Sequence, residues 1–219
     1  MRVCLASTSP ARRMLLRQVG IEPELVAPEV DEEAVIEAVE AAESRVLTPD
    51  EHVALLARRK AADVVARLTL EDPGFDGLVI GGDSMFELDG AVLGKPHTPE
   101  RAIERWHAMR GRTGTLHSGH SVFRVSADGG AHEEHAVARA SVTFVADVTD
   151  AEIEAYVATG EPLGVAGAFT VDSLGAAFIE RVEGDPSTVV GMSLSTVRML
   201  VRRLGVDWTS LWAQPRKPL

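Results

Sequence analysis

The amino-acid sequence predicts an α/β fold with a mixed central sheet and flanking helices around one core. Helices with clear end signals alternate with apolar strands early in the chain, and hairpin turns dominate the middle. The 219 residues are 45% hydrophobic and 25% charged, which excludes the disordered, collagen-like and disulfide-rich secreted classes. We expect residues 1–212 to form a single domain and residues 213–219 to be frayed.

Five helices are predicted from residues that favour helix ends. Ser, Thr and Pro favour the first turn, and Gly favours the residue after the last turn. Thr48 with Glu51, and Thr149 with Glu152, form capping boxes. These signals place helices at about residues 10–19, 49–69, 99–110, 150–159 and 193–204, beside an exposed Ala/Glu/Val-rich helix within residues 32–46.

Strands are predicted between these helices. Continuous apolar runs at residues 3–6 and 78–80 suit buried strands. The Asp-Gly pairs at residues 89–90 and 128–129 predict hairpins, the second of which joins strands near residues 116–125 and 135–145. Residues 169–171 and 176–182 complete the predicted sheet.

The chain is acidic, with 22 Lys and Arg against 33 Asp and Glu, a net charge of −11 and a pI near 5.1. That balance argues against a nucleic-acid polymer or an anionic membrane as a partner. A polyanionic ligand would therefore need a local cluster of basic side chains. The one cysteine, Cys4, lies in an apolar run and is expected to be buried in a reducing compartment. We expect a cytoplasmic protein.

The first candidate site is the strand, turn and helix start over residues 5–13. Free backbone N–H groups and hydroxyls, including that of Ser7, converge where the helix dipole favours an anion. Arg12 and Arg13 add guanidinium groups suited to phosphate, although arginine at this end opposes the dipole. The pattern fits equally an ordinary capped helix with two surface arginines.

Acidic residues form the second candidate site. Asp83 follows an apolar run and two glycines, which predicts a carboxylate at the carboxyl end of a buried strand with room for another group close to the backbone. Asp31 and Glu32 lie in a loop and could share a divalent metal with Asp83. The alternatives are an Asx turn at Asp83 and a solvated acidic turn at the other pair.

Two lysines complete the pattern. Lys60 lies on the apolar stripe of its helix, where a lysine must either snorkel to the surface or meet an anion. Lys95 stands between Gly94 and Pro96, which limit the reach of its ammonium group. Neither a G-x-G-x-x-G sequence nor a Walker A sequence is present. These basic and acidic residues together favour a phosphoryl site, where cations hold phosphates and acids hold Mg²⁺ and activate water.

The order of these segments resembles the Maf family of nucleoside triphosphate pyrophosphatases. The resemblance runs from Val3 to about Leu204 and rests on seven ordered motifs: LASTSPARR at residues 5–13, APEVDE at 27–32, KA at 60–61, IGGD at 80–83, LGKP at 93–96, AGAF at 166–169 and VVG at 189–191. It implies an α/β structure of the Maf/ITPase type with two lobes around a cleft, often as a homodimer. The residues that it implies for the triphosphate are Ser7, Arg12, Arg13, Lys60 and Lys95.

The resemblance also implies chemistry. Asp83 would be the general base for water, and Glu32 would join it around Mg²⁺ or Mn²⁺. The reaction would be hydrolysis of a nucleoside triphosphate between the α- and β-phosphates, giving a monophosphate and pyrophosphate and removing non-canonical or excess nucleotides. The alternative is a nucleotide-binding regulator of cell division and septum formation with little turnover.

Three positions depart from both known subfamily patterns: Ala11, Ser84 and Asp172. The subfamily that prefers dTTP and UTP usually has Arg, Thr and Gln there, and the one that prefers 7-methyl-GTP has Trp, Gln and Glu. We expect these three residues to line the base-recognition side of the cleft. The resemblance leaves the preferred base open.

Overall fold

The computed structural model describes residues 1–212. Within that range, seven strands form one mixed sheet in the order β2-β1-β3-β5-β6-β7, and β4 pairs with β3 off this path. The strands are β1 (Arg2–Ala6), β2 (Glu24–Leu25), β3 (Gly77–Leu88), β4 (Ala91–Leu93), β5 (Thr113–Val125), β6 (Ala131–Phe144) and β7 (Ile179–Glu183).

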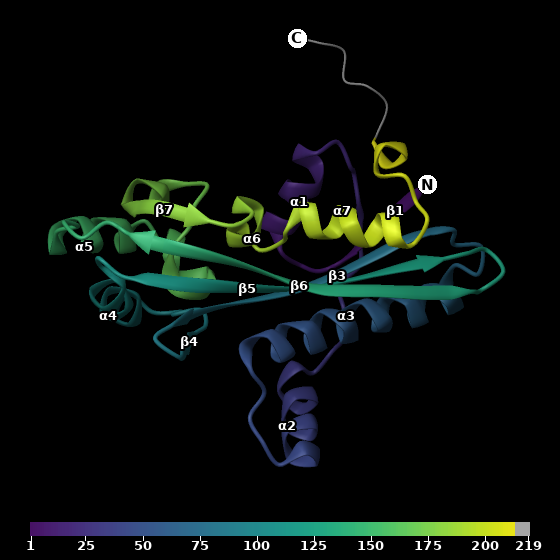
Figure 1. Ribbon diagram of the computed structural model, residues 1–219, viewed down its shortest axis with the longest axis horizontal. Helices are drawn as coiled ribbons and strands as arrows, with labels where there is room; N and C mark the ends of the chain where they lie inside the picture. Colours follow the sequence, from purple (N-terminus) through teal and green to yellow (C-terminus); the bar gives the residue numbers. More distant parts are fainter. Residues whose placement is uncertain (213–219) are drawn as a thin grey trace, which may run out of the picture.

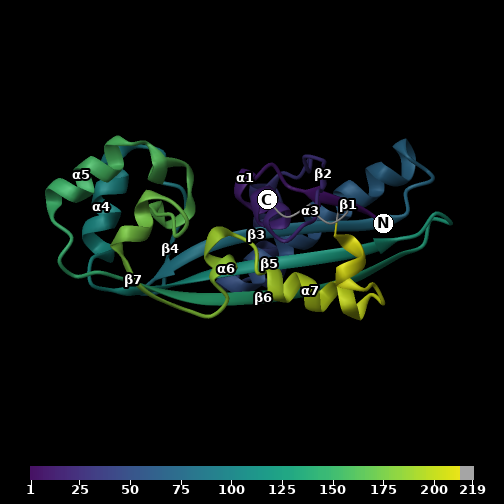
Figure 2. The ribbon, with the colours of Figure 1, turned by 90° about the horizontal axis from the view of Figure 1, so that it is seen from above.

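The helices cover both faces of the sheet. α3 runs along one face, α1 and α7 lie on the other, and α4 and α5 gather at the far end of the long strands (Figures 1 and 2). The α-helices are α1 (Pro10–Gln18), α2 (Glu32–Glu43), α3 (Pro49–Glu71), α4 (Pro99–Met109), α5 (Asp150–Ala158), α6 (Pro186–Val190) and α7 (Leu194–Arg203). No helix within residues 1–212 is long and apolar enough to cross a membrane.

The predicted helix ends are confirmed. Both capping boxes form, because Thr48 and Thr149 each accept from the backbone N–H three residues on while the glutamate there reaches back. Ser9 and Ser193 also cap their helices through their side chains. The glutamate-rich helix is α2, and none of its residues is buried.

Strand β3 corrects the prediction that the buried strand ends at its glycine pair. It continues to Leu88 and pairs with β5 from Gly77↔Val125 to Glu87↔Thr115. A Cβ on Gly81 would lie 2.4 Å from the carbonyl oxygen of Ala57. A strand glycine lets another backbone approach closely, so this one admits α3 rather than a turn. Asp83 therefore lies within a strand and not at its end.

The edge of β3 opposite β5 has a gap. β1 leaves the sheet after pairing Ala6↔Gly81, and β4 joins it only at Phe86↔Leu93. Within the described chain, residues 82–85 have no strand on that edge. We call this edge the notch, and the backbone groups that it exposes lie beside Asp83.

The segment before β7 also differs from the prediction. Residues 169–171 form no strand, and 3₁₀ turns flank them at η2 (Ala166–Ala168) and η3 (Leu174–Phe178). The apolar side chain of Phe169 reflects burial in the core rather than a strand. Gly167, two residues earlier, has a φ of +74°, which interrupts an extended path. Strand β7 starts at Ile179, and neither β2 nor α6 was predicted. The expected fraying of residues 213–219 lies outside the described residues.

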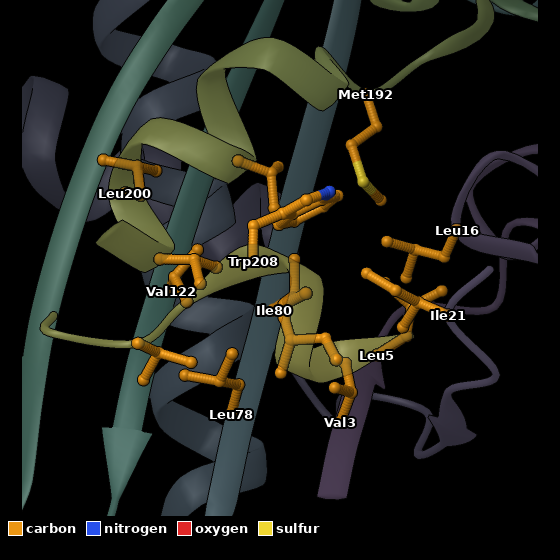
Figure 3. Close-up of a cluster of buried hydrophobic side chains, with 14 of the residues drawn as sticks. Val3, Leu5, Leu16, Ile21, Leu78, Ile80, Val122, Met192, Leu200 and Trp208 are labelled. Carbon is orange, nitrogen blue, oxygen red and sulfur yellow. The ribbon is translucent and has the colours of Figure 1, made fainter. Parts of the chain in front are cut away.

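Two lobes share the sheet, as expected. In one lobe, a cluster that includes Leu5, Ile80 and Trp208 packs α1 and α7 onto the sheet (Figure 3), and Cys4 packs with α3 on the other face. Burial raises the pKa of the Cys4 thiol to about 12, which suits an inert core residue. In the other lobe, Trp106 packs in an aromatic cluster with α4 and α5. The notch lies between these cores.

Candidate active site

The turn after β1 forms one wall of a cavity of about 500 Å³. The backbone N–H of Ser9 donates to Ser7 Oγ at 3.1 Å, and that of Arg12 donates to Ser9 Oγ at 3.4 Å. These bonds shape the turn at the positive end of α1. The cavity is lined by Ser7, Thr8, Ser9, Pro10, Arg13, Met14, Arg17, Gln18 and Leu25.

Arg12 is anchored inside the protein. Its Nη1 donates to Ser7 Oγ at 3.2 Å, its Nη2 to Ser84 Oγ at 3.1 Å and its Nε to the carbonyl oxygen of Gly191 at 2.8 Å. Burial lowers the pKa of this guanidinium, while the charges of Asp83 and Glu32 act in the opposite direction. The alternative that Arg12 is a surface arginine is therefore wrong.

The surroundings of Arg12 include two groups that sequence reasoning missed: its partner the Gly191 carbonyl, and Ser118, which contacts two of its partners. The Gly191 carbonyl is also within hydrogen-bond distance of Ser84 Oγ, at 3.1 Å, and of Ser118 Oγ, at 3.3 Å. Ser118 is fully buried on β5, and its Oγ lies 2.9 Å from that of Ser84. Ser84 thus holds Arg12 in place. The only sequence signal was the VVG motif, whose glycine adopts a φ of +120°.

Arg13 has more freedom than Arg12. Its side chain is 40% exposed beside the cavity, and its Nη2 lies 3.7 Å from Glu22. Its Nε is buried and has no hydrogen-bond partner among the described residues. The first turn of α1 therefore presents one fixed guanidinium and one that can move toward an anion.

Lys60 joins two carboxylates. Its Nζ lies 2.7 Å from Asp83 Oδ1 and 2.8 Å from Glu32 Oε1, and the residue is only 7% exposed. Of the two alternatives left open for Lys60, snorkelling is wrong, because its ammonium meets the protein's own acids. Asp31 accepts instead from the backbone N–H of Ala34 at 3.1 Å, as the N-cap of α2.

The donor set here fits a divalent metal that arrives with phosphate. Asp83 and Glu32 offer hard oxygens that already converge on one cation, the ammonium of Lys60. The described residues contain no group of three or more His, Cys, Asp or Glu that could hold a metal ion. Mg²⁺ commonly takes one or two carboxylates and completes its shell with phosphates and water. These two acids are therefore sufficient ligands only when a phosphate supplies the others.

The two halves of the site lie on opposite faces of β3. Successive residues of a strand point to opposite faces, so Asp83 meets Lys60 on the α3 side and Ser84 meets Arg12 on the α1 side. The strand separates them, and the notch is the open edge of the strand beside both groups. A phosphate chain at the notch would meet a guanidinium on one side and the lysine–carboxylate group on the other.

Two predicted residues lie apart from this cluster. Lys95 is exposed in the loop between β4 and α4, and Asp172 is exposed in the loop between η2 and η3. No contact within residues 1–212 links either side chain to Arg12 or Asp83. Ala11 is half-buried on α1, next to Arg12. The structure therefore brings together the residues from α1, α2, α3 and β3, and leaves Lys95 and Asp172 on loops of the other lobe.

Comparison with known proteins places the chain in a family. The family model described as "Maf-like protein" matches residues 2–204. A protein of Leifsonia xyli subsp. xyli is 61% identical over 214 residues, covering 97% of each chain. Proteins of Salinispora tropica and Rhodococcus jostii are 50% and 48% identical, covering 98% and 95% of this chain and 88% and 95% of their own. All three are named nucleoside triphosphate pyrophosphatase. This chain belongs to the Maf family.

Proposed function

We propose that this protein is a nucleoside triphosphate pyrophosphatase, which hydrolyses the bond between the α- and β-phosphates to give a nucleoside monophosphate and pyrophosphate. One observation supports this above the others. A buried lysine joins Asp83 and Glu32 on one face of β3, and the anchored Arg12 lies on the other face, at the only strand edge of β3 left open within residues 1–212. The names of its relatives point to the same activity.

Two of the groups that bind the phosphates need little rearrangement. Ser7 and Arg12 are held by hydrogen bonds before any ligand arrives, so binding orders few side chains. Arg13 moves from the cavity wall to the phosphates, and Lys60 neutralises charge from the α3 side. Lys95 reaches the triphosphate from its loop in the other lobe. Each contact is a charge-assisted hydrogen bond, the stronger class of such bonds.

Asp83 is the general base. Lys60 holds its Oδ1, and no described residue donates a hydrogen bond to its Oδ2. The side chain is 14% exposed, so water reaches it. An oriented carboxylate with one open oxygen can accept the proton of a water molecule that attacks the phosphoanhydride.

Glu32 and Asp83 would hold Mg²⁺ or Mn²⁺ together with the phosphates. The metal, when bound, neutralises charge that develops on the phosphate oxygens. Glu32 is suited to this role because its side chain is 50% exposed and can shift, whereas the shorter Asp83 side chain is fixed by the strand.

The substrates are non-canonical or excess nucleotides in the cytoplasm. Ala11 leaves space beside Arg12, and Asp172 offers a carboxylate that can accept from an amino or imino group of a base. A homodimer is part of the same proposal, and light scattering on the purified protein tests it.

The proposal is tested by pyrophosphate release from a panel of canonical and modified nucleoside triphosphates, with and without Mg²⁺ or Mn²⁺. We expect metal-dependent release of pyrophosphate and a nucleoside monophosphate in equal amounts. Release of orthophosphate instead would place cleavage at the wrong bond. Tight nucleotide binding without any release, with either metal, would favour the low-turnover regulator.

A further inference from the structure

We propose that Glu161 is a positioning residue for base discrimination, because its carboxylate fixes both ends of the loop that carries Asp172. The inference rests on the proposed function, in which Asp172 meets the base. Glu161 opens the 3₁₀ turn η1 (Glu161–Gly164), directly after α5. No motif in the sequence pointed to it.

The carboxylate of Glu161 is surrounded by donors. Oε1 accepts from the hydroxyls of Tyr156, at 3.0 Å, and Thr170, and from the backbone N–H of Gly175 at 3.1 Å. Oε2 accepts from Ser173 Oγ at 2.7 Å and from the backbone N–H of Leu174 at 3.3 Å. These donors come from both sides of Asp172. The carboxylate thus closes a loop with Asp172 between its two fixed ends.

The loop requires a full carboxylate at this point. Burial raises the pKa of Glu161, but the hydrogen bonds from Thr170, Ser173 and Gly175 outweigh it and hold the pKa at about 2. Gly175 is also required by space, because a Cβ there would lie 2.6 Å from both the Thr170 carbonyl oxygen and the Tyr156 hydroxyl. The carboxylate stays ionised at any pH at which the protein works.

The same segment is tied to the strand that carries the catalytic acid. A Cβ on Gly167 would lie 2.8 Å from the ring of Phe86, so the backbone just before the loop packs on β3 near Asp83. The indole N–H of Trp106 donates to the carbonyl oxygen of Ala168 at 2.8 Å. Because Glu161 ties Thr170 and residues 173–175 together beside this anchored segment, it determines where Asp172 lies relative to the notch.

The substitution Glu161→Gln separates positioning from general packing. Glutamine keeps the shape but replaces one oxygen with an NH₂ group, which cannot accept. In either orientation of the amide, one backbone N–H, that of Leu174 or that of Gly175, loses its acceptor. Glu154→Gln is the matched control. It removes the same charge from neighbouring α5, at an exposed position.

The experiment measures kcat/KM for a panel of nucleoside triphosphates and for methyl triphosphate, which has phosphates but no base. We expect Glu161→Gln to reduce the ratio between best and worst base by about tenfold or more, as loss of a hydrogen-bonded recognition group does. Activity on methyl triphosphate should stay unchanged, as should the profile of Glu154→Gln. Adding Glu161→Gln to Asp172→Ala should change nothing further, because both act through one contact.

Three outcomes would overturn the inference. These are an unchanged base profile in Glu161→Gln, an equal loss on methyl triphosphate, and additive effects in the double variant. If Glu161→Gln fails to fold, Ser173→Ala removes a single donor and must still weaken discrimination. If the wild-type protein cleaves no nucleotide, the proposed function itself is contradicted. If the wild-type protein is active and Glu161→Gln keeps its base profile, only this inference is contradicted.

Discussion

The Nε of Arg12 lies 2.8 Å from the carbonyl oxygen of Gly191, although 179 residues separate the two. One belongs to the first turn of α1, and the other ends α6. The anion-binding turn near the N-terminus is therefore completed by a segment near the end of the described chain. It follows that the arginine geometry forms only when α1, β3 and the end of α6 have come together.

The close contact between α3 and the sheet gives a first prediction. A Cβ on Gly119 would lie 2.1 Å from the carbonyl oxygen of Val53, so Gly119→Ala must push α3 away. We expect a loss of about 1–3 kcal/mol in the free energy of unfolding, as for other overpacked sites, together with lower activity because Lys60 moves. Urea unfolding measures this. Gly74→Ala, with no atom within 4 Å of the new Cβ, should be neutral, and equal losses in both variants would contradict the contact.

Lys60→Met should lower the rate of pyrophosphate release and raise the affinity for a divalent metal. The variant leaves Asp83 and Glu32 without the ammonium that occupies their shared position. Without nucleotide, we expect lower stability that Mn²⁺ restores, and Mn²⁺ affinity higher by roughly tenfold, because no protein cation competes for the oxygens. Pyrophosphate release should fall. Calorimetric titration with Mn²⁺ tests this, with Lys95→Met as the control that should leave Mn²⁺ affinity unchanged.

Arg13→Ala and Lys95→Ala should weaken substrate handling without unfolding the chain. Each removes one charge-assisted contact worth about 1.5–3 kcal/mol, which corresponds to a fall of about tenfold to a hundredfold in kcat/KM. Both side chains are at least partly exposed, so thermal stability should hold. Arg198→Ala on α7 is the matched control. Unaltered kcat/KM in both variants, at low and at moderate salt, would remove them from the phosphate site.

His120 should make stability depend on pH. It is buried, its Nε2 accepts from the backbone N–H of Ser193 at 2.9 Å, and burial followed by the charge of Arg12 lowers its pKa to about 4. The unfolded chain takes up this proton near pH 6.5 and the native state only near pH 4, so stability falls as the pH drops through that range, by up to about 3 kcal/mol. His120→Gln keeps the acceptor and should flatten this part of the pH–stability curve. A curve that matches wild type would contradict the assignment.

Local signals were enough to predict much of the fold. Helix ends depend on residues within a few positions of the cap, so Ser9 and Thr149 were identified from sequence alone. Helical periodicity placed Lys60 on the apolar stripe of α3 but left open whether it snorkels or is buried against an anion. The path of β3 did not follow from local signals, because a glycine pair suits a turn as well as a close helix contact. Only the packing of Ala57 against Gly81 decides between them.

Sequence reasoning named the side chains proposed for the chemistry but missed the groups that hold them in place. The residue types themselves suggest phosphate or metal chemistry at Ser7, Arg12, Asp83 and Glu32. The Gly191 carbonyl carries no such signal, since every residue has one, and Ser118 is an ordinary serine until β5 places it opposite Ser84. These supports come from long-range contacts, which no local pattern encodes.

The central claim is that Asp83 takes the proton of the attacking water, and pyrophosphate release by Asp83→Asn tests it most directly. Asparagine keeps the size of the side chain and removes the proton acceptor, so release should fall by about 10²–10⁴-fold while the fold and nucleotide binding persist. Asp147→Asn, at an exposed position, controls for loss of a carboxylate and should retain the wild-type rate. Release by Asp83→Asn at close to the wild-type rate would contradict the account.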